Sequence, residues 1–117
     1  MYNLKNVNLY FLRGESIIQI SFGKYLTQFY FGENINISSG DEIVVSYMNK
    51  NLTIYPDKEI VDIPIKQLIG KIINKVEVEE DKNLILFLND GIKLSFMSTD
   101  ESCESYSINY ERGTIIV

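Results

Sequence analysis

Apolar and polar residues alternate along most of this chain with a period of two rather than 3.6. Within residues 25–31, Phe29 and Phe31 share one face, while Gln28 falls on the other. Residues 34–38 and 91–96 alternate in the same way. A period of two is typical of strands that have one buried face and one solvated face. These segments, rich in β-branched and aromatic residues, therefore predict half-buried strands.

The segment 91–96 makes the most specific of these predictions. It follows Asn89-Asp90-Gly91, a strong hairpin signal because glycine readily takes a positive φ. Strands this closely spaced, with no long helical segment between them, predict an all-β domain, either a sandwich or a partly open barrel. Within this segment the expected inward residues are Ile92, Leu94 and Phe96, and the expected outward residues are Lys93 and Ser95.

The two halves of the chain share one pattern. Leu12-Arg13-Gly14 recurs 56 residues later as Leu68-Ile69-Gly70, and the apolar positions that follow also recur, at an offset of 56 and then of 57. We interpret residues 1–117 as one domain of two similar β-meander repeats, at about residues 8–55 and 64–117. The matched positions are Ile17, Ile20, Phe22, Phe29, Phe31, Ile35 and Ile37 with Ile73, Val76, Val78, Leu86, Leu88, Ile92 and Leu94. The alternative is a chance likeness, since alternation is common in β proteins.

Each predicted repeat begins and ends in the same way. Residues 8–12 and 64–68 each predict a single helical turn, and residues 43–55 and 105–117 each predict a closing hairpin. Both prolines, Pro56 and Pro64, bracket the connector 56–64. Proline is poorly tolerated inside central strands, so its restriction to a connector agrees with this division.

Composition and charge exclude several classes of protein. A chain of 117 residues, 45% of them hydrophobic, can bury a core of ordinary size. No apolar run approaches the roughly 18–20 residues of a membrane span, and the N-terminus lacks the features of a secretory signal. Eleven basic against sixteen acidic residues argue against a nucleic-acid partner. The composition, rich in Ile, Asn, Lys and Tyr, favours a cytoplasmic protein from a low-GC bacterium.

The candidate chemistry is sparse. The chain has no histidine, which removes every Ser-His, Cys-His and His-metal arrangement. Its single cysteine, Cys103, cannot close an intrachain disulfide, and the acids around it disfavour a thiolate. The acidic run 77–81 lacks the spacing of a calcium-binding loop and is interpreted as solvated charge at a strand edge. We therefore expect a non-enzymatic protein with no catalytic residues, metal site or cofactor.

The acidic charge is concentrated in the second half. Residues 1–58 carry five basic and five acidic side chains, whereas residues 59–117 carry six basic and eleven acidic ones. Two similar scaffolds need similar surfaces, so this asymmetry indicates either drift or a partner. An acidic surface can bind a basic cleft by charge complementarity, with gains in association rate and specificity.

The second half also resembles a known family. The matching segments are residues 68–72, 83–94 and 113–117, together with Glu104-Ser105-Tyr106-Ser107-Ile108. They resemble a family of small bacterial all-β proteins of unknown function that carry a Tyr-Glu-Ser-Tyr-type signature near the C-terminus. Cys103 stands at the first aromatic position of that signature. Similar proteins occur among the immunity proteins of bacterial toxin systems, and the resemblance implies no catalytic residue.

Together these observations predict an immunity-type inhibitor that neutralises a basic toxin domain through an acidic surface. The expected contact residues are Glu77, Glu79, Glu80, Asp81, Asp100, Glu101 and Glu104, with Tyr106 and Tyr110 as aromatic anchors. One alternative is a small-ligand or carbohydrate-binding module that uses exposed aromatic residues. Another is a structural domain that forms a homo-oligomer through a sheet edge.

Overall fold

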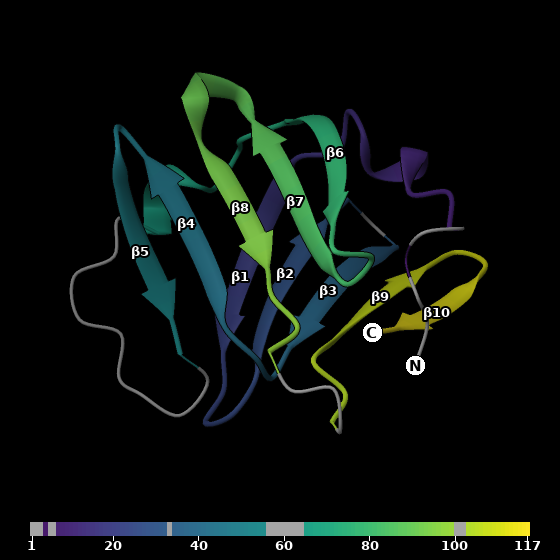
Figure 1. Ribbon diagram of the computed structural model, residues 1–117. Helices are drawn as coiled ribbons and strands as arrows, with labels where there is room; N and C mark the ends of the chain where they lie inside the picture. The colour runs from purple at the N-terminus through teal and green to yellow at the C-terminus, as the bar shows by residue number, and fades with distance from the viewer. Residues whose placement is uncertain (1–3, 5–6, 33, 56–64, 100–102) are drawn as a thin grey trace.

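The chain folds into two antiparallel five-stranded sheets packed face to face (Figure 1). The computed structural model describes residues 4, 7–32, 34–55, 65–99 and 103–117. Two short 3₁₀ turns, η2 (Tyr10–Leu12) and η3 (Ile65–Gln67), precede the strands of the two halves, and a third, η4 (Asn89–Gly91), joins β7 to β8. The strands are β1 (Ile17–Phe22), β2 (Thr27–Phe31), β3 (Ile35–Ser39), β4 (Ile43–Tyr47), β5 (Lys50–Ile54), β6 (Ile73–Glu79), β7 (Asn83–Leu88), β8 (Lys93–Phe96), β9 (Tyr106–Tyr110) and β10 (Gly113–Ile116).

The all-β prediction is confirmed, and the two sheets form a sandwich rather than a closed barrel. One sheet has the order β1-β2-β3-β9-β10 and the other the order β5-β4-β8-β7-β6. Each half of the chain therefore contributes three strands to one sheet and a hairpin to the other. The hairpin β4–β5 pairs with β8, and the hairpin β9–β10 pairs with β3. The expected helical turns are present as η2 and η3, whereas the connector 56–64 lies outside the described residues.

The two sheets meet through reciprocal backbone bonds near the start of β1 and β6. Gly14 N–H donates to the Ile73 carbonyl at 2.8 Å, and Gly70 N–H donates to the Ile17 carbonyl at 2.7 Å. Both glycines have a positive φ, +85° and +87°, which L side chains rarely adopt. Directly after them, Ser16 and Ile72 form an isolated antiparallel bridge. The Leu-x-Gly motif thus has the same backbone structure in both halves.

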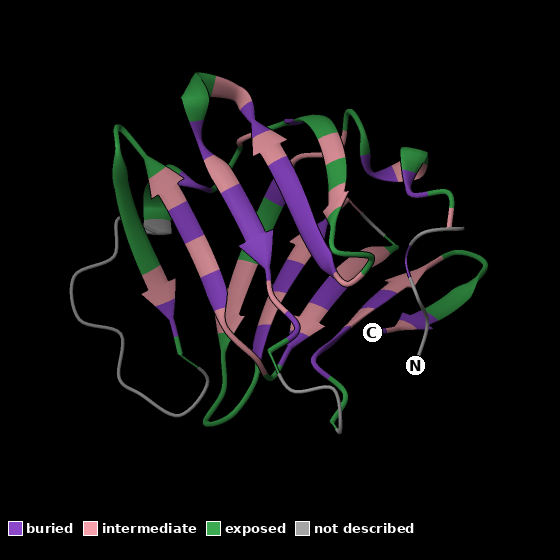
Figure 2. Ribbon diagram, in the orientation of Figure 1, coloured by how far each residue is buried: buried purple, intermediate pink, exposed green. Residues whose placement is uncertain are grey.

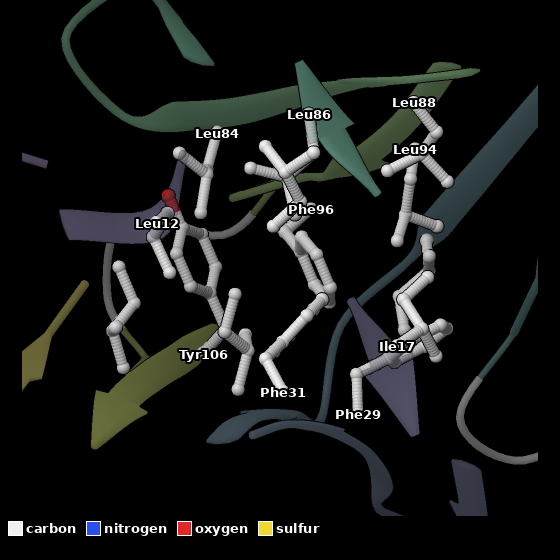
Figure 3. Close-up of a cluster of buried hydrophobic side chains, with 14 of the residues drawn as sticks. Leu12, Ile17, Phe29, Phe31, Leu84, Leu86, Leu88, Leu94, Phe96 and Tyr106 are labelled. Atoms are coloured by element: carbon white, nitrogen blue, oxygen red, sulfur yellow. The ribbon is translucent and has the colours of Figure 1, made fainter. Parts of the chain in front are cut away.

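The core between the sheets draws on both halves of the chain (Figure 3). Phe29 of β2 meets Phe96 of β8 edge to face, with 5.4 Å between ring centroids. Phe96 also lies 6.0 Å from the ring of Tyr106 on β9. Full burial of such rings removes a large apolar area from water, so truncating one to alanine typically costs about 3–5 kcal/mol. The predicted inward positions Ile92, Leu94 and Phe96 are all buried.

Ser95 has the predicted outward orientation, yet this residue is only 4% exposed. It lies on the outer face of its sheet, but β8 is the central strand there. Val44 and Ile85 flank it in register on the two neighbouring strands, and these larger side chains cover it. Figure 2 shows the same effect along β7, which is buried over nearly its whole length, whereas the edge strand β5 is mostly exposed.

Asp41 joins the β3–β4 turn to the segment that follows β8. One carboxylate oxygen accepts the Thr99 N–H at 2.7 Å, and the other accepts the Thr99 hydroxyl and the Glu42 N–H, each also at 2.7 Å. Burial alone would raise the pKa of Asp41, but these hydrogen bonds outweigh it and hold the pKa below its ordinary value. The ionised carboxylate therefore stabilises the fold.

We expect Asp41→Asn to lower the free energy of unfolding by about 1–3 kcal/mol at neutral pH, because the amide cannot accept all three hydrogen bonds. The folded pKa lies below the unfolded one, so the contribution is complete above the unfolded pKa and is lost as pH falls through the folded pKa. Urea denaturation at neutral pH and at a pH of about 3 measures both effects. The matched control is Asp90→Asn, which removes an exposed ion pair with Lys71 and should cost no more than about 1 kcal/mol. Equal losses in the two variants would contradict this role for Asp41.

Candidate binding surfaces

Four of the predicted contact residues lie together at one edge of the sandwich. Glu77 and Glu79 lie two residues apart on β6, the edge strand of its sheet, and share its outward face with Lys75. Glu80 and Asp81 follow in the β6–β7 turn, and all four acidic side chains are exposed. We call Glu77, Glu79, Glu80 and Asp81 the acidic edge. Lys75 forms an ion pair with Glu77 at 2.7 Å, which partly offsets the negative charge at one end.

The β6–β7 turn holds two of these acids in an unusual backbone conformation. Glu80 and Asp81 have φ values of 55° and 57°, and Lys82 N–H closes the turn on the Glu79 carbonyl at 3.2 Å. Positive φ at both central residues is the pattern of a type I′ turn, whose twist matches that of the flanking strands. The Asp81 carbonyl accepts the Leu4 N–H at 2.9 Å, so the turn is also held against the N-terminal segment. Both carboxylates are therefore displayed on a well-defined loop.

Glu104 lies at the same end of the sandwich as this turn. Glu104 belongs to the connection between β8 and β9. At one end of this connection, Ser98 N–H donates to the side-chain oxygen of Asn83, the first residue of β7, at 2.9 Å. At its other end, the hydroxyl of Tyr106, the first residue of β9, donates to the Lys82 carbonyl at 2.7 Å. Glu104 itself is exposed. The predicted contact residues Asp100 and Glu101 belong to this connection but lie outside the described residues.

The prediction that Tyr106 anchors a partner is wrong, because its side chain is 2% exposed and lies among the core residues (Figure 3). Its hydroxyl is used internally on the Lys82 carbonyl, and burial raises the pKa of this phenol above its ordinary value. Alternation along β9 also turns Tyr110 toward the inner face, but Tyr110 remains partly exposed. It stacks on Phe11 with 4.5 Å between centroids, so it is placed in a cleft rather than on the acidic edge.

This cleft, of about 610 Å³, lies between the N-terminal segment and the sheet that contains β9. We call it the aromatic cleft; its lining includes Phe11, Glu15, Asn34, Tyr110, Glu111 and Arg112. A second cleft of about 490 Å³ occupies the corresponding place in the other half, where Tyr47, Gln67 and Lys71 stand. There Lys71 forms an ion pair with Asp90. The sequence pattern did not indicate Phe11 or Glu15 as site residues. The signal that could have found them is the repeat, because the matching positions 56 residues later hold Gln67 and Lys71, which differ from them in chemistry.

The aromatic run Phe29-Tyr30-Phe31 divides between the two faces of its sheet. Phe29 and Phe31 are fully buried, and only Tyr30 points outward, where its hydroxyl donates to the Gln28 side-chain oxygen at 2.6 Å. Among the other tyrosines, Tyr25 and Tyr47 are exposed, but they lie in the β1–β2 turn and at the end of β4 respectively. These tyrosines therefore do not form one patch with Tyr30 on the strand face.

Within the described part of the chain, no three His, Cys, Asp or Glu side chains lie close enough together to hold a metal ion. None of the helices described is long and apolar enough to cross a membrane. Comparisons with protein families, with curated proteins and with solved structures find no match for this chain. The arguments about function therefore rest on the surfaces described above.

If Tyr106 acts only within the fold, Tyr106→Phe should lower the free energy of unfolding by about 1 kcal/mol, because the Lys82 carbonyl loses its donor while the ring stays packed. Tyr47→Phe, at an exposed site, is the control and should change stability by less than about 0.5 kcal/mol. Urea denaturation of both variants makes the comparison. A Tyr106→Phe protein as stable as the wild type would contradict a structural role for this hydroxyl.

Proposed function

We propose that this protein is a non-enzymatic binding domain of the bacterial cytoplasm, an immunity-type inhibitor that neutralises a basic toxin domain. The observation that carries the proposal is the acidic edge, which displays four exposed carboxylates along β6 and its turn. Glu104 extends the negative surface at the same end of the sandwich. Four carboxylates spread along a strand and its turn complement an extended basic surface better than they complement a single small cation.

The physical argument is electrostatic. Exposed carboxylates on one edge create a local negative potential, which attracts a basic partner before contact and raises the association rate. Toxin domains that act on nucleic acids carry basic clefts, and an acidic loop can occupy such a cleft in place of the phosphate backbone. The type I′ turn supports this role, since the backbone that carries Glu80 and Asp81 is already ordered before binding.

We also propose that the two halves arose from one duplicated β-meander. Support comes from the matched Leu-x-Gly segments, from the reciprocal bonds of Gly14 and Gly70, and from β-bulges at Ile17 and Ile73, which lie 56 residues apart. On this view the acidic edge is a feature of one copy alone. In β1, the strand that corresponds to β6, Ser21 stands at the place of Glu77.

A second candidate function is small-ligand binding in the aromatic cleft. The observation that favours it is the difference between the two corresponding clefts: one has a stacked Phe11–Tyr110 pair beside Glu15, the other an ion pair between Lys71 and Asp90. A ligand that binds the native state raises the melting temperature. A thermal-shift screen of sugars and nucleotides, with Phe11→Ala as the control, distinguishes this candidate from protein binding.

The acidic edge is tested by a variant that removes its charge without bulky changes, Glu79→Gln/Glu80→Gln/Asp81→Asn. A basic protein captured from the native lysate is first identified and purified, and its association rate is then measured by surface plasmon resonance over a range of salt. We expect the variant to associate on the order of tenfold more slowly at low salt, with the difference shrinking at high salt.

The control raises the net charge by the same amount elsewhere, with Asn51→Lys/Glu111→Lys on β5 and in the β9–β10 turn. It should leave the association rate close to that of the wild type. Equal rates for the wild type and the triple variant would show that the acidic edge is not the contact surface. A captured protein with no basic surface would contradict the electrostatic proposal as a whole.

A further inference from the structure

The outer face of the sheet β1-β2-β3-β9-β10, the rear sheet in Figure 1, carries mainly uncharged polar side chains. Ten of its outward positions form two rows that cross all five strands in register, and the bulged Ile18 of β1 belongs to neither row. Nine of the ten are uncharged polar residues, and the tenth is Ile116. The first row is Gln19, Tyr30, Asn36, Asn109 and Thr114, and the second is Ser21, Gln28, Ser38, Ser107 and Ile116. We call this surface the amide–hydroxyl face.

Side-chain hydrogen bonds link the strands across this face. Asn109 donates to the Asn36 oxygen at 2.8 Å, and Thr114 donates to the Asn109 oxygen, also at 2.8 Å. Gln28 donates to the Ser38 hydroxyl at 3.2 Å and accepts the Tyr30 hydroxyl at 2.6 Å. These bonds fix the orientation of the Asn and Gln amides, so the donors and acceptors that the bonds do not use face solvent in fixed positions. Such an ordered surface loses little conformational entropy when a ligand binds.

The fold does not impose this composition, because the other sheet has the same arrangement with different residues. Its corresponding rows are Lys75, Phe87, Lys93, Ser46 and Asn51, and Glu77, Ile85, Ser95, Val44 and Thr53. Lys93 there takes the place that Asn36 has on the amide–hydroxyl face. That outer face thus carries three charged and several apolar side chains, whereas the ten positions of the amide–hydroxyl face carry no charge.

We propose that the amide–hydroxyl face binds a neutral polysaccharide. Each sugar hydroxyl both donates and accepts hydrogen bonds, as do Ser, Thr and Tyr hydroxyls, and an Asn or Gln amide presents a donor beside an acceptor. An uncharged ligand brings no opposite charge to offset the desolvation of charged side chains, so a face without charge suits a neutral polymer. The Tyr30 ring, in the first row next to Asn36, adds an apolar surface for the C–H face of a sugar.

The shape of the face favours a polymer over a monosaccharide. Strands lie about 4.8 Å apart, so a row across five strands extends for roughly 19 Å. A second copy of this chain is the less favoured occupant, because protein interfaces concentrate aromatic and apolar residues at their centre and are poor in serine. Here the central strand β3 presents Asn36 and Ser38. The proposal does not depend on the acidic edge, which belongs to the other sheet.

The test is native affinity electrophoresis in gels that contain hydroxyethylcellulose, galactomannan, glycogen or mixed-linkage β-glucan, with carboxymethylcellulose as the anionic comparison. We expect at least one neutral polymer to retard the wild-type protein, and high salt to leave the retardation unchanged. Asn36→Lys, which copies Lys93 of the other sheet, should weaken the interaction on the order of tenfold or more. Gln19→Lys, at the exposed edge of the same row, should weaken it less.

Asn51→Lys is the matched control, since it adds the same charge to the outer face of the other sheet and should leave retardation unchanged. Circular dichroism and thermal unfolding test whether each variant is folded; if Asn36→Lys is not, the comparison rests on Gln19→Lys.

Retardation by the anionic polymer alone, or by none of the polymers, would overturn the proposal, as would equal retardation of wild type and folded Asn36→Lys. A dimer in light scattering that Asn36→Lys dissociates would assign the face to a second copy instead. The charge-removed acidic-edge variant should still bind the polysaccharide, so the two proposals fail separately.

Discussion

The architecture depends on two antiparallel pairings, β3 with β9 and β4 with β8, by which each half of the chain completes the sheet begun by the other. Three strands of one half form a meander whose free edge would otherwise expose unpaired backbone groups. The hairpin from the other half covers that edge and also brings its inward side chains over the core. Phe29 and Phe96 then meet between the sheets, so each half supplies one ring of this core contact.

This arrangement also decides which surfaces remain for binding. The inner faces are used against each other, and the pairings of β3 with β9 and β4 with β8 leave β1, β10, β5 and β6 as the edges. Of these, β6 presents carboxylates in solvent, which both discourages edge-to-edge association and creates a negative potential. The outer faces are equivalent in topology but not in chemistry, since Lys93 stands on one where Asn36 stands on the other. Differences between such equivalent places are informative because the fold does not require them.

The sequence pattern was a reliable guide where burial on one face decides the residue type. Phe29 and Phe31 alternate with Tyr30, and the structure buries the first two and turns the third outward. It was less reliable where a side chain's neighbours on other strands decide its exposure. Ser95 is an outward polar residue yet is buried, because it lies on a central strand between Ile85 of the same hairpin and Val44 of the distant β4. Tyr106 is amphipathic, so its phenol could equally face a partner or an internal carbonyl, and only the position of Lys82 decides between them.

By itself the sequence determined the all-β class, the positions of the hairpins and helical turns, and the exposure of the acidic edge. These properties are local: alternation, turn chemistry and clustered charge act over a few neighbouring residues. The tertiary structure alone decided that the closing hairpins exchange between sheets, that Phe11 and Tyr110 meet in a cleft, and that residues from five strands align as one uncharged face. Those outcomes depend on pairing between segments many residues apart, and a period of two is compatible with many partners for every strand.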